Sequence, residues 1–186
     1  MKIVIAITGA SGSIYAEDLL NRMLKIESSI ESIAIVRSKN AELVWEHELE
    51  TKWPEHSKLT YFDKRNFMAP FASGSAGWDA MVIVPCSMGT LGRISNGISD
   101  DLITRAADVM LKENKKLIIC PREMPFNQIH LKNLLTVQQA GATILPTSPS
   151  FYSKPQNIRE LIGTVTTRII DHLKINQENT FRWGDA

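Results

Sequence analysis

The 186-residue sequence is 44% hydrophobic and 22% charged, with a formal net charge of +1. This length and composition favour one well-cored domain over residues 1–186, and the near-neutral charge excludes a broad binding surface for nucleic acid or anionic membranes. No secretory leader pattern and no apolar run of membrane-spanning length is found, so we expect a cytoplasmic protein.

The first element is a buried strand that ends at a glycine turn. Residues 3–7 are an unbroken apolar run rich in β-branched side chains, typical of a strand buried on both faces. The small residues at 9–12 allow close approach of a ligand, and helical spacing begins at Ile14. The N–H groups that open this helix favour a phosphate. The turn matches neither the dinucleotide fingerprint nor a Walker A loop, so alone it leaves a structural turn and a phosphate turn equally open.

The second strand, at 33–36, ends in Arg37, Ser38 and Lys39. An NAD-binding Rossmann domain usually has an acidic residue near this point, so these residues argue against NAD. They leave NADP open and equally suit a mononucleotide phosphate or ring. The helix expected over 40–50 carries Glu48, whose charge by itself is best interpreted as a solvated surface group.

Residues 51–80 are expected to be a long irregular excursion. Its large apolar residues Phe67, Met68 and Phe71 predict that it lines a pocket or a subunit contact. A buried strand at 80–84 follows, and it stops at a run of small and hydroxyl residues over 85–90. This second loop should face the same sheet edge as the glycine turn.

The second half of the chain continues the alternation of strands and helices. Helices are expected over 100–114, 127–140 and 157–174, and strands over 117–120 and 142–145. These elements predict a three-layer, Rossmann-like (flavodoxin-like) α/β fold in which helices cover both faces of a parallel sheet.

Three further groups of residues are candidates for a functional or structural role. Arg105, Asp108 and Lys112 share one helix face and read as a surface ion-pair ladder. The pair Arg122-Glu123 follows a central strand, where open α/β sheets keep their ligands. Cys86 and Cys120 end apolar runs, which predicts buried thiols in a reducing compartment.

Taken together, seven segments are more specific than any one of them. They resemble the UbiX-type flavin prenyltransferases in order across nearly the whole chain: Thr8-Gly-Ala-Ser-Gly12, Pro85-Cys-Ser-Met-Gly-Thr-Leu91, Leu102-Ile-Thr-Arg-Ala-Ala-Asp-Val109, Leu111-Lys-Glu113, Pro121-Arg-Glu-Met-Pro125, Gly141-Ala-Thr-Ile-Leu-Pro146 and Phe151-Tyr-x-x-Pro-Gln156. The resemblance implies transfer of a dimethylallyl group from dimethylallyl monophosphate to N5 and C6 of reduced FMN. The product, prenylated FMN, would serve a separate decarboxylase.

The resemblance also implies roles for individual residues. The flavin would be held by Gly9, Ala10, Ser11, Ser38, Ser87, Met88, Gly89, Thr90 and Arg122. The prenyl phosphate would be held by Tyr152 and Arg168, with Lys112 and Arg105 adding charge from a neighbouring helix or subunit. Glu48 and Glu123 match acidic residues near the flavin, Glu123 being favoured as the proton shuttle. The tail at 175–186, with Phe181-Arg-Trp-Gly184, would pack on a neighbouring subunit of a dodecamer.

Two positions depart from the family pattern. Phe67 stands where some members carry tryptophan, and Gly89 stands where others carry lysine. Both changes alter the expected shape of the pocket and could change donor preference. Neither removes a proton carrier or a main phosphate-binding cation.

The residues fit the chemistry independently of the resemblance. Arg and Tyr donors suit a phosphate leaving group, because charge-assisted hydrogen bonds to phosphate are strong and directional. The segment Asp100-Asp-Leu-Ile-Thr104 lacks the last acid of the Mg²⁺-binding prenyltransferase motif, so metal-free use of a monophosphate is expected. The alternatives are an FMN-dependent cysteine decarboxylase, a non-catalytic FMN-binding module and an NADP-linked reductase using Arg37 and Lys39.

Overall fold

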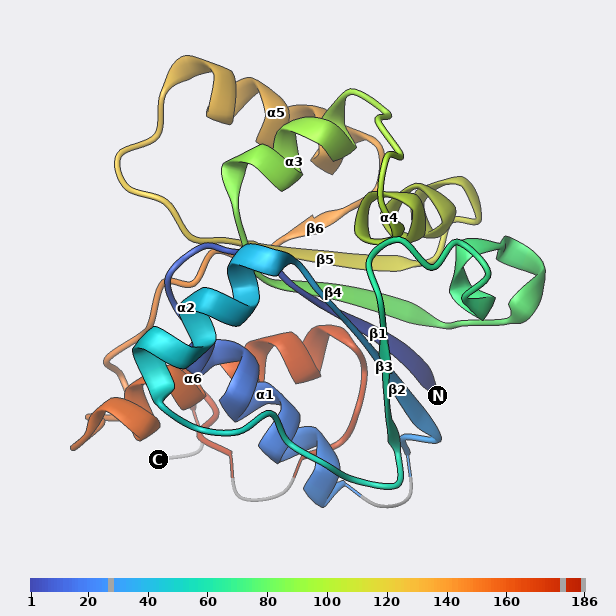
Figure 1. Ribbon diagram of the computed structural model, residues 1–186. Helices are drawn as coiled ribbons and strands as arrows, with labels where there is room; N and C mark the ends of the chain where they lie inside the picture. Colours follow the sequence, from blue (N-terminus) through green and yellow to red (C-terminus); the bar gives the residue numbers. More distant parts are fainter. Residues whose placement is uncertain (27–28, 178–179, 185–186) are drawn as a thin grey trace.

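The computed structural model describes residues 1–26, 29–177 and 180–184, and a twisted six-stranded sheet runs through its centre (Figure 1). The strands are β1 (Lys2–Ile7), β2 (Ser32–Arg37), β3 (Leu59–Phe62), β4 (Ala80–Cys86), β5 (Lys116–Pro121) and β6 (Thr143–Ile144). They lie in the order β3-β2-β1-β4-β5-β6, and every neighbouring pair is parallel. The predicted parallel α/β fold is confirmed.

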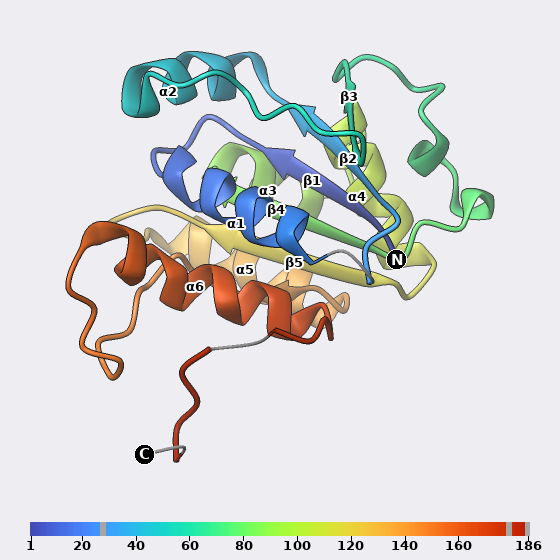
Figure 2. The same cartoon turned by 90° about the horizontal axis from the view of Figure 1, so that it is seen from below.

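Helices cover both faces of this sheet, as Figures 1 and 2 show. One face carries α1 (Ser13–Lys25), α2 (Lys39–Leu49) and α6 (Ile158–His172). The other carries α3 (Met88–Ser95), α4 (Leu102–Lys112), α5 (Gln128–Gln139) and the short 3₁₀ turns η1 (Pro70–Ala72) and η2 (Gly74–Ala76). Among the described residues, no helix has both the length and the apolar character needed to cross a membrane.

Alternation along the strands separates two hydrophobic cores. In β1, Ile3, Ile5 and Ile7 pack beneath α1 and α6, whereas Val4 and Ala6 pack beneath the opposite helices. All five of these side chains are fully buried, which explains the continuous apolar run in the sequence. The sheet is thus the middle layer of three.

The cysteines follow the same alternation. Cys86 and Cys120 are buried free thiols in opposite cores, as the apolar runs predicted. Burial raises the pKa of Cys86 to about 12. The thiol is therefore protonated at neutral pH and chemically quiet.

Two elements were missed by the sequence prediction. Edge strand β3 lies inside the stretch expected to be irregular, and α3 begins at Met88, inside the loop expected over 85–90. Phe71 of the same stretch is fully buried, with its ring edge-on to Phe62 and Trp78, while 48% of Phe67 and 92% of Met68 are exposed. This stretch thus closes one core and leaves two large side chains on the surface.

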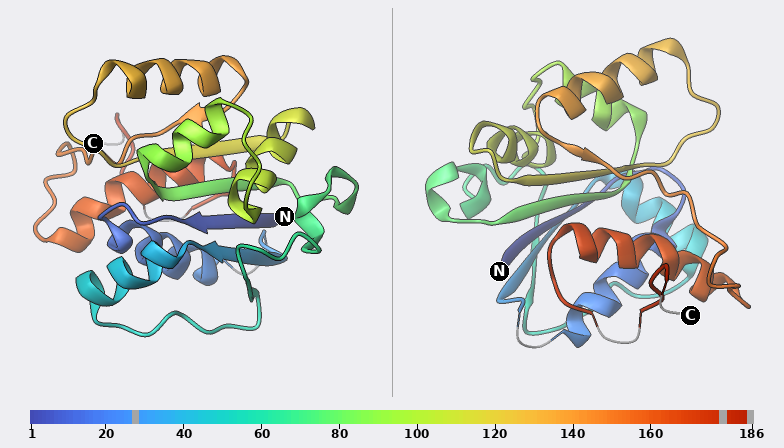
Figure 3. Two further views of the ribbon diagram at one scale, coloured as in Figure 1. Left: turned by 45° about the horizontal axis from the view of Figure 1, so that its top comes forward. Right: turned by 180° about the vertical axis from the view of Figure 1, so that it is seen from behind.

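The carboxyl ends of the central strands are tied into one rim. Ser38 N donates to Ile7 O at 3.0 Å, and Thr8 Oγ1 donates to Pro85 O at 2.7 Å. The backbone N–H of Ser87 donates to Thr8 Oγ1 at 2.8 Å. Because the chain leaves β1 for β2 on one side and returns to β4 on the other, this rim is the topological switch point, where open α/β sheets bind ligands (Figure 3).

Candidate functional site

A cleft of about 520 Å³ opens at this switch point. It contains five of the predicted flavin-binding positions together with charged residues from α2, α3 and two loops. Its lining residues are Thr8, Gly9, Ser38, Lys39, Asn40, Lys64, Ser87, Gly89, Thr90, Arg93, Asp100 and Asp101.

Two helices begin at the cleft, each with a serine at its N-cap. Ser38 Oγ accepts from Ala41 N at 3.1 Å at the start of α2, and Ser87 Oγ accepts from Thr90 N at 3.4 Å at the start of α3. The positive ends of both helix dipoles and the cations Lys39 and Lys64 therefore meet at one cavity. Such a donor set fits the phosphate ester and polar side chain of a flavin mononucleotide.

At the glycine turn, which the sequence left open as a structural turn or a phosphate turn, the structure places a carboxylate. The Glu48 carboxylate accepts from Gly12 N at 3.0 and 2.9 Å and from Ser13 N at 2.8 Å. Burial would raise the pKa of Glu48, but hydrogen bonds from the Ser11 side chain and from these two N–H groups outweigh it and lower the pKa. An ionised carboxylate thus caps α1 in this structure.

Arg122 directly follows β5 and connects the end of that strand to the glycine turn. Its Nε donates to Ser11 O at 2.9 Å, and its backbone N donates to Cys86 O at 3.2 Å. The structure therefore brings Arg122, Ser11 and Glu48 together around one turn. Glu123 is exposed on the same rim, where its carboxylate accepts from Met124 N at 3.1 Å.

Gly9 lets two segments approach closely at the cleft. A Cβ atom built on Gly9 would lie 2.4 Å from Asn40 Cβ, which no side chain tolerates. The predicted positions Ala10 and Met88 are only 6% and 8% exposed. Met88 is the first residue of α3, and its side chain packs in the core on that face of the sheet.

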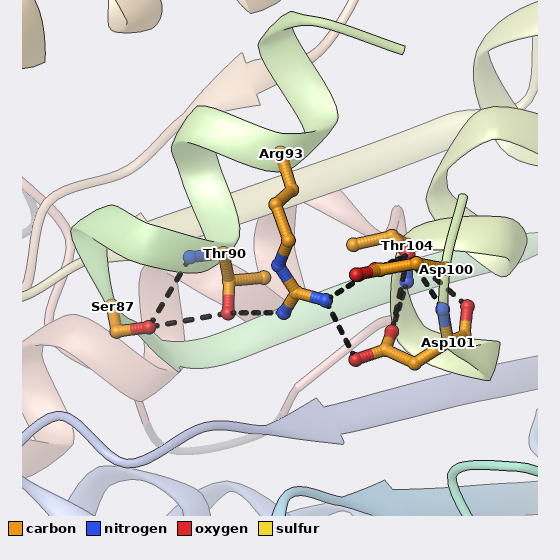
Figure 4. Close-up of polar contacts among 6 residues, drawn as sticks. All are labelled: Ser87, Thr90, Arg93, Asp100, Asp101 and Thr104. Atoms are coloured by element: carbon orange, nitrogen blue, oxygen red, sulfur yellow. Dashed lines mark hydrogen bonds and ion pairs between the residues drawn. The ribbon is translucent and has the colours of Figure 1, made fainter. Parts of the chain in front are cut away.

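The sequence prediction did not single out Arg93, whose guanidinium makes three hydrogen bonds at the cleft. Its Nη1 donates to Asp100 Oδ1 at 2.6 Å and to Asp101 Oδ2 at 2.8 Å, and its Nη2 donates to Thr90 Oγ1 at 3.4 Å (Figure 4). The sequence signal was the Asp100-Asp101 pair, which was considered only as part of an incomplete Mg²⁺-binding motif at the start of a helix. Nothing in the spacing of seven and eight residues indicated that both carboxylates hold one arginine.

Tyr152 and Arg168 lie on the α6 side of the molecule. The Tyr152 ring is edge-on to Trp183 of the tail, with ring centroids 4.9 Å apart. Arg168 donates to Asp171 at 2.9 Å, and Arg182 makes two further hydrogen bonds to the same carboxylate at 2.6 and 2.8 Å. Packing of the tail on a neighbouring subunit stays a prediction, and its residues 178–179 and 185–186 lie outside the described part of the chain.

Arg105 and Lys112 lie on α4, which covers the opposite face of the sheet (Figure 2). Arg105 Nε donates to Ala72 O at 3.0 Å, and its Nη1 pairs with Asp108 at 3.2 Å. Lys112 pairs with Glu113. Within one chain, the sheet therefore lies between these two cations and the pair of Tyr152 and Arg168.

Arg37 is engaged in a way that disfavours an NADP site. Its guanidinium lies 4.6 Å from the ring centroid of Trp53 and 5.1 Å from that of Tyr61, and its Nε pairs with Glu42 at 2.9 Å. Binding a 2′-phosphate with Arg37 would require these contacts to break.

Comparisons with known proteins identify the family of this chain. The sequence matches the Flavoprotein family over residues 1–170. It is 45% identical over 186 residues to the flavin prenyltransferase UbiX of Methanocaldococcus jannaschii, covering 99% of both chains.

Solved structures give the same result. The fold matches AnUbiX (PadA1), crystallised in complex with FMN and dimethylallyl pyrophosphate, with a TM-score of 0.85, 35% identity and coverage of 97% of this chain and 98% of that one. It also matches a dodecameric FMN-dependent UbiX-like decarboxylase from Escherichia coli O157:H7, with a TM-score of 0.89, 33% identity and coverage of 98% and 99%. The chain belongs to the Flavoprotein family and, within it, to the UbiX flavin prenyltransferases.

Proposed function

We propose that this protein transfers a dimethylallyl group from a dimethylallyl phosphate ester to N5 and C6 of reduced FMN. The prenylated FMN would be the cofactor of a separate decarboxylase. The observation that carries this proposal is the 45% identity, over the full length of both chains, to a curated flavin prenyltransferase. The cleft, with its hydroxyls, helix N-termini and lysines, supports a phosphate-bearing flavin as the acceptor.

The flavin would lie across the switch-point rim. Ser38, Ser87 and Thr90 would hydrogen-bond its polar side chain, while Gly9 and Gly89 leave room for it. Arg122 would contact it from the other end of the rim, beside Ala10 and Ser11. When bound and reduced, the flavin supplies the electron-rich N5 and C6 atoms that accept the allyl group.

The prenyl phosphate would be held by Tyr152 and Arg168. As the allylic C–O bond breaks, negative charge grows on the leaving phosphate, and a fixed guanidinium stabilises that charge. Arg105 and Lys112 would add positive charge from a neighbouring copy, because they lie on the opposite face of their own chain. This arrangement fits the dodecamer described for the Escherichia coli relative.

Closing the ring at C6 releases one proton from that carbon, and a carboxylate on the rim is suited to accept it. Glu123 is exposed to solvent, and its carboxylate accepts a hydrogen bond from the backbone N–H of Met124. Glu48 is held by the α1 N-terminus, where it would position the turn and relay the proton. We therefore assign the shuttle to Glu123.

The test is to incubate the purified protein anaerobically with reduced FMN and dimethylallyl monophosphate, with the diphosphate in a parallel reaction. The expected product is a flavin heavier by one prenyl unit in mass spectrometry. An unchanged flavin mass despite demonstrated FMN binding would contradict the proposal and favour a non-catalytic flavin carrier. Arg168→Ala is the matched control, since it should weaken donor binding and leave FMN bound.

A further inference from the structure

Arg93 lines the cleft, but its positive charge is already paired with two carboxylates of the protein. One nitrogen, Nη1, lies 2.6 Å from Asp100 Oδ1 and 2.8 Å from Asp101 Oδ2. These two carboxylates neutralise the guanidinium before any ligand arrives. Arg93 therefore differs from Lys39 and Lys64, which line the same cleft.

Asp101 ties Arg93 to a second helix. Its Oδ1 accepts from Thr104 N at 2.9 Å and so caps α4, while its Oδ2 takes the arginine (Figure 4). Burial would raise the pKa of Asp101, but the Arg93 and Thr104 hydrogen bonds outweigh it and lower the pKa. The guanidinium is thereby fixed between α3, which carries it, and the first turn of α4.

The other terminal nitrogen of the guanidinium, Nη2, points at Thr90, which is only 4% exposed. Arg93 Nη2 lies 3.4 Å from Thr90 Oγ1, and Ser87 Oγ donates to the same oxygen at 3.1 Å. Arginine has no acceptor atom, so in this pair the threonine oxygen must accept. With two donors on its oxygen, Thr90 is left with its single O–H proton for an acceptor in the cleft.

We infer that Arg93 is a positioning residue that fixes the Thr90 hydroxyl as a hydrogen-bond donor to an oxygen of the bound flavin. The inference rests on the proposed function only in taking the flavin as the occupant of the cleft. Arg93 acts through Thr90 and does not itself bind the ligand. Because the hydroxyl is already oriented in this way, it loses little conformational entropy when the flavin binds.

The test is a double-mutant cycle on FMN affinity, measured by quenching of flavin fluorescence. Arg93→Met and Thr90→Val should each raise the dissociation constant about tenfold, the effect of one lost hydrogen bond to a fixed partner. The combined variant should be no weaker than Thr90→Val alone, because both changes remove the same donor. Independent, multiplying losses would mean that Arg93 binds the flavin directly and would overturn the inference, as would unchanged affinity in Arg93→Met.

Arg93→Lys separates positioning from stability. Lysine keeps the ion pair with the aspartates, but its compact ammonium cannot also reach Thr90 with a second, fixed N–H group. This variant should keep the melting temperature of the wild type and bind FMN as weakly as Arg93→Met. Wild-type affinity in Arg93→Lys would overturn the inference.

One control variant completes the experiment. Arg22→Lys changes another helical arginine paired with an aspartate, at 2.6 Å, away from the cleft and should leave FMN affinity unchanged. This test can be read even if the proposed function fails. The double-mutant cycle measures only FMN affinity, so it gives its answer also for a protein that binds FMN without prenylating it.

Discussion

Gly9 and Gly89 line the same cleft but have opposite steric surroundings. A Cβ on Gly9 would lie 2.4 Å from Asn40 Cβ, whereas a Cβ on Gly89 would meet no atom within 4 Å. Gly9→Ala should therefore lower the free energy of unfolding by about 2 kcal/mol through overpacking. Gly89→Ala should raise it by roughly 0.5–1 kcal/mol, because alanine favours the helix.

Urea unfolding of the ligand-free protein measures both values. The double variant Gly9→Ala/Asn40→Gly should recover part of the loss, since it removes the atom that clashes. A stability of Gly9→Ala equal to that of the wild type would show that the turn can open, and that glycine is not needed for the approach of α2.

Glu48 contributes to the stability of the rim as well as to the proposed chemistry. Glu48→Ala removes the acceptor for Gly12 N and Ser13 N, so unfolding should become easier by about 1 kcal/mol, as for other lost helix caps. Because the folded-state pKa of Glu48 is lowered, this contribution is present above the ordinary carboxyl pKa and is lost as the pH falls through the lowered value. Unfolding curves at neutral and acidic pH check the effect, and Glu46→Ala on the same helix is the control. If the difference in stability between the wild type and Glu48→Ala does not shrink in acid, the prediction is contradicted.

The elements of this fold were predictable to the extent that they are long and buried. Strands β1, β2, β4 and β5 are apolar runs with both faces covered, so the hydrophobic pattern of the sequence predicts them. Strand β3 has four residues, only partly buried, at the sheet edge, and α3 carries Gly89 and Gly92, which weaken its helical signal. The missed elements are thus those that tertiary contacts stabilise more than local preference does.

The start of α4 is an element whose stability should depend on pH. Asp101 both caps the helix and pairs with Arg93. Asp101→Asn keeps a capping oxygen and loses only the charge, so it should destabilise the protein less than Asp101→Ala, which should cost about 2 kcal/mol.

The two variants should also respond differently to acid. The pKa of Asp101 is lowered in the folded state, so the stability supplied by its charge is present above the ordinary carboxyl pKa and disappears as the pH falls through the lowered value. Thermal unfolding over an acidic pH series should show the wild-type curve approaching that of Asp101→Asn. A constant separation between the two curves would mean that the charge is not what stabilises this turn.

At the scale of the whole molecule, the sequence predicted which loops meet at the rim of the sheet but not which faces the other predicted site residues occupy. Residues that directly follow a parallel strand must meet at one edge, so Gly9, Ser38 and Ser87 could be placed together from the chain alone. Residues within helices carry no such constraint. Only the structure reveals that Arg168 and Lys112 lie on opposite faces of the sheet (Figure 2). It also shows that Asp100 and Asp101 both hold Arg93, and that Glu48 has partners 35 and 36 residues away.

This separation predicts that active sites are shared between copies of the chain. Arg168→Ala and Lys112→Ala should each be nearly inactive, since each removes one cation from every prenyl-phosphate site. When the two variants are expressed together and assemble at random, roughly a quarter of the sites should receive an intact Arg168 from one copy and an intact Lys112 from another. Flavin prenylation by the mixture should then rise well above that of either variant alone. Mixing the variants after separate assembly is the control and should give no gain, and a co-expressed mixture as inactive as its parents would place both cations in the site of one chain.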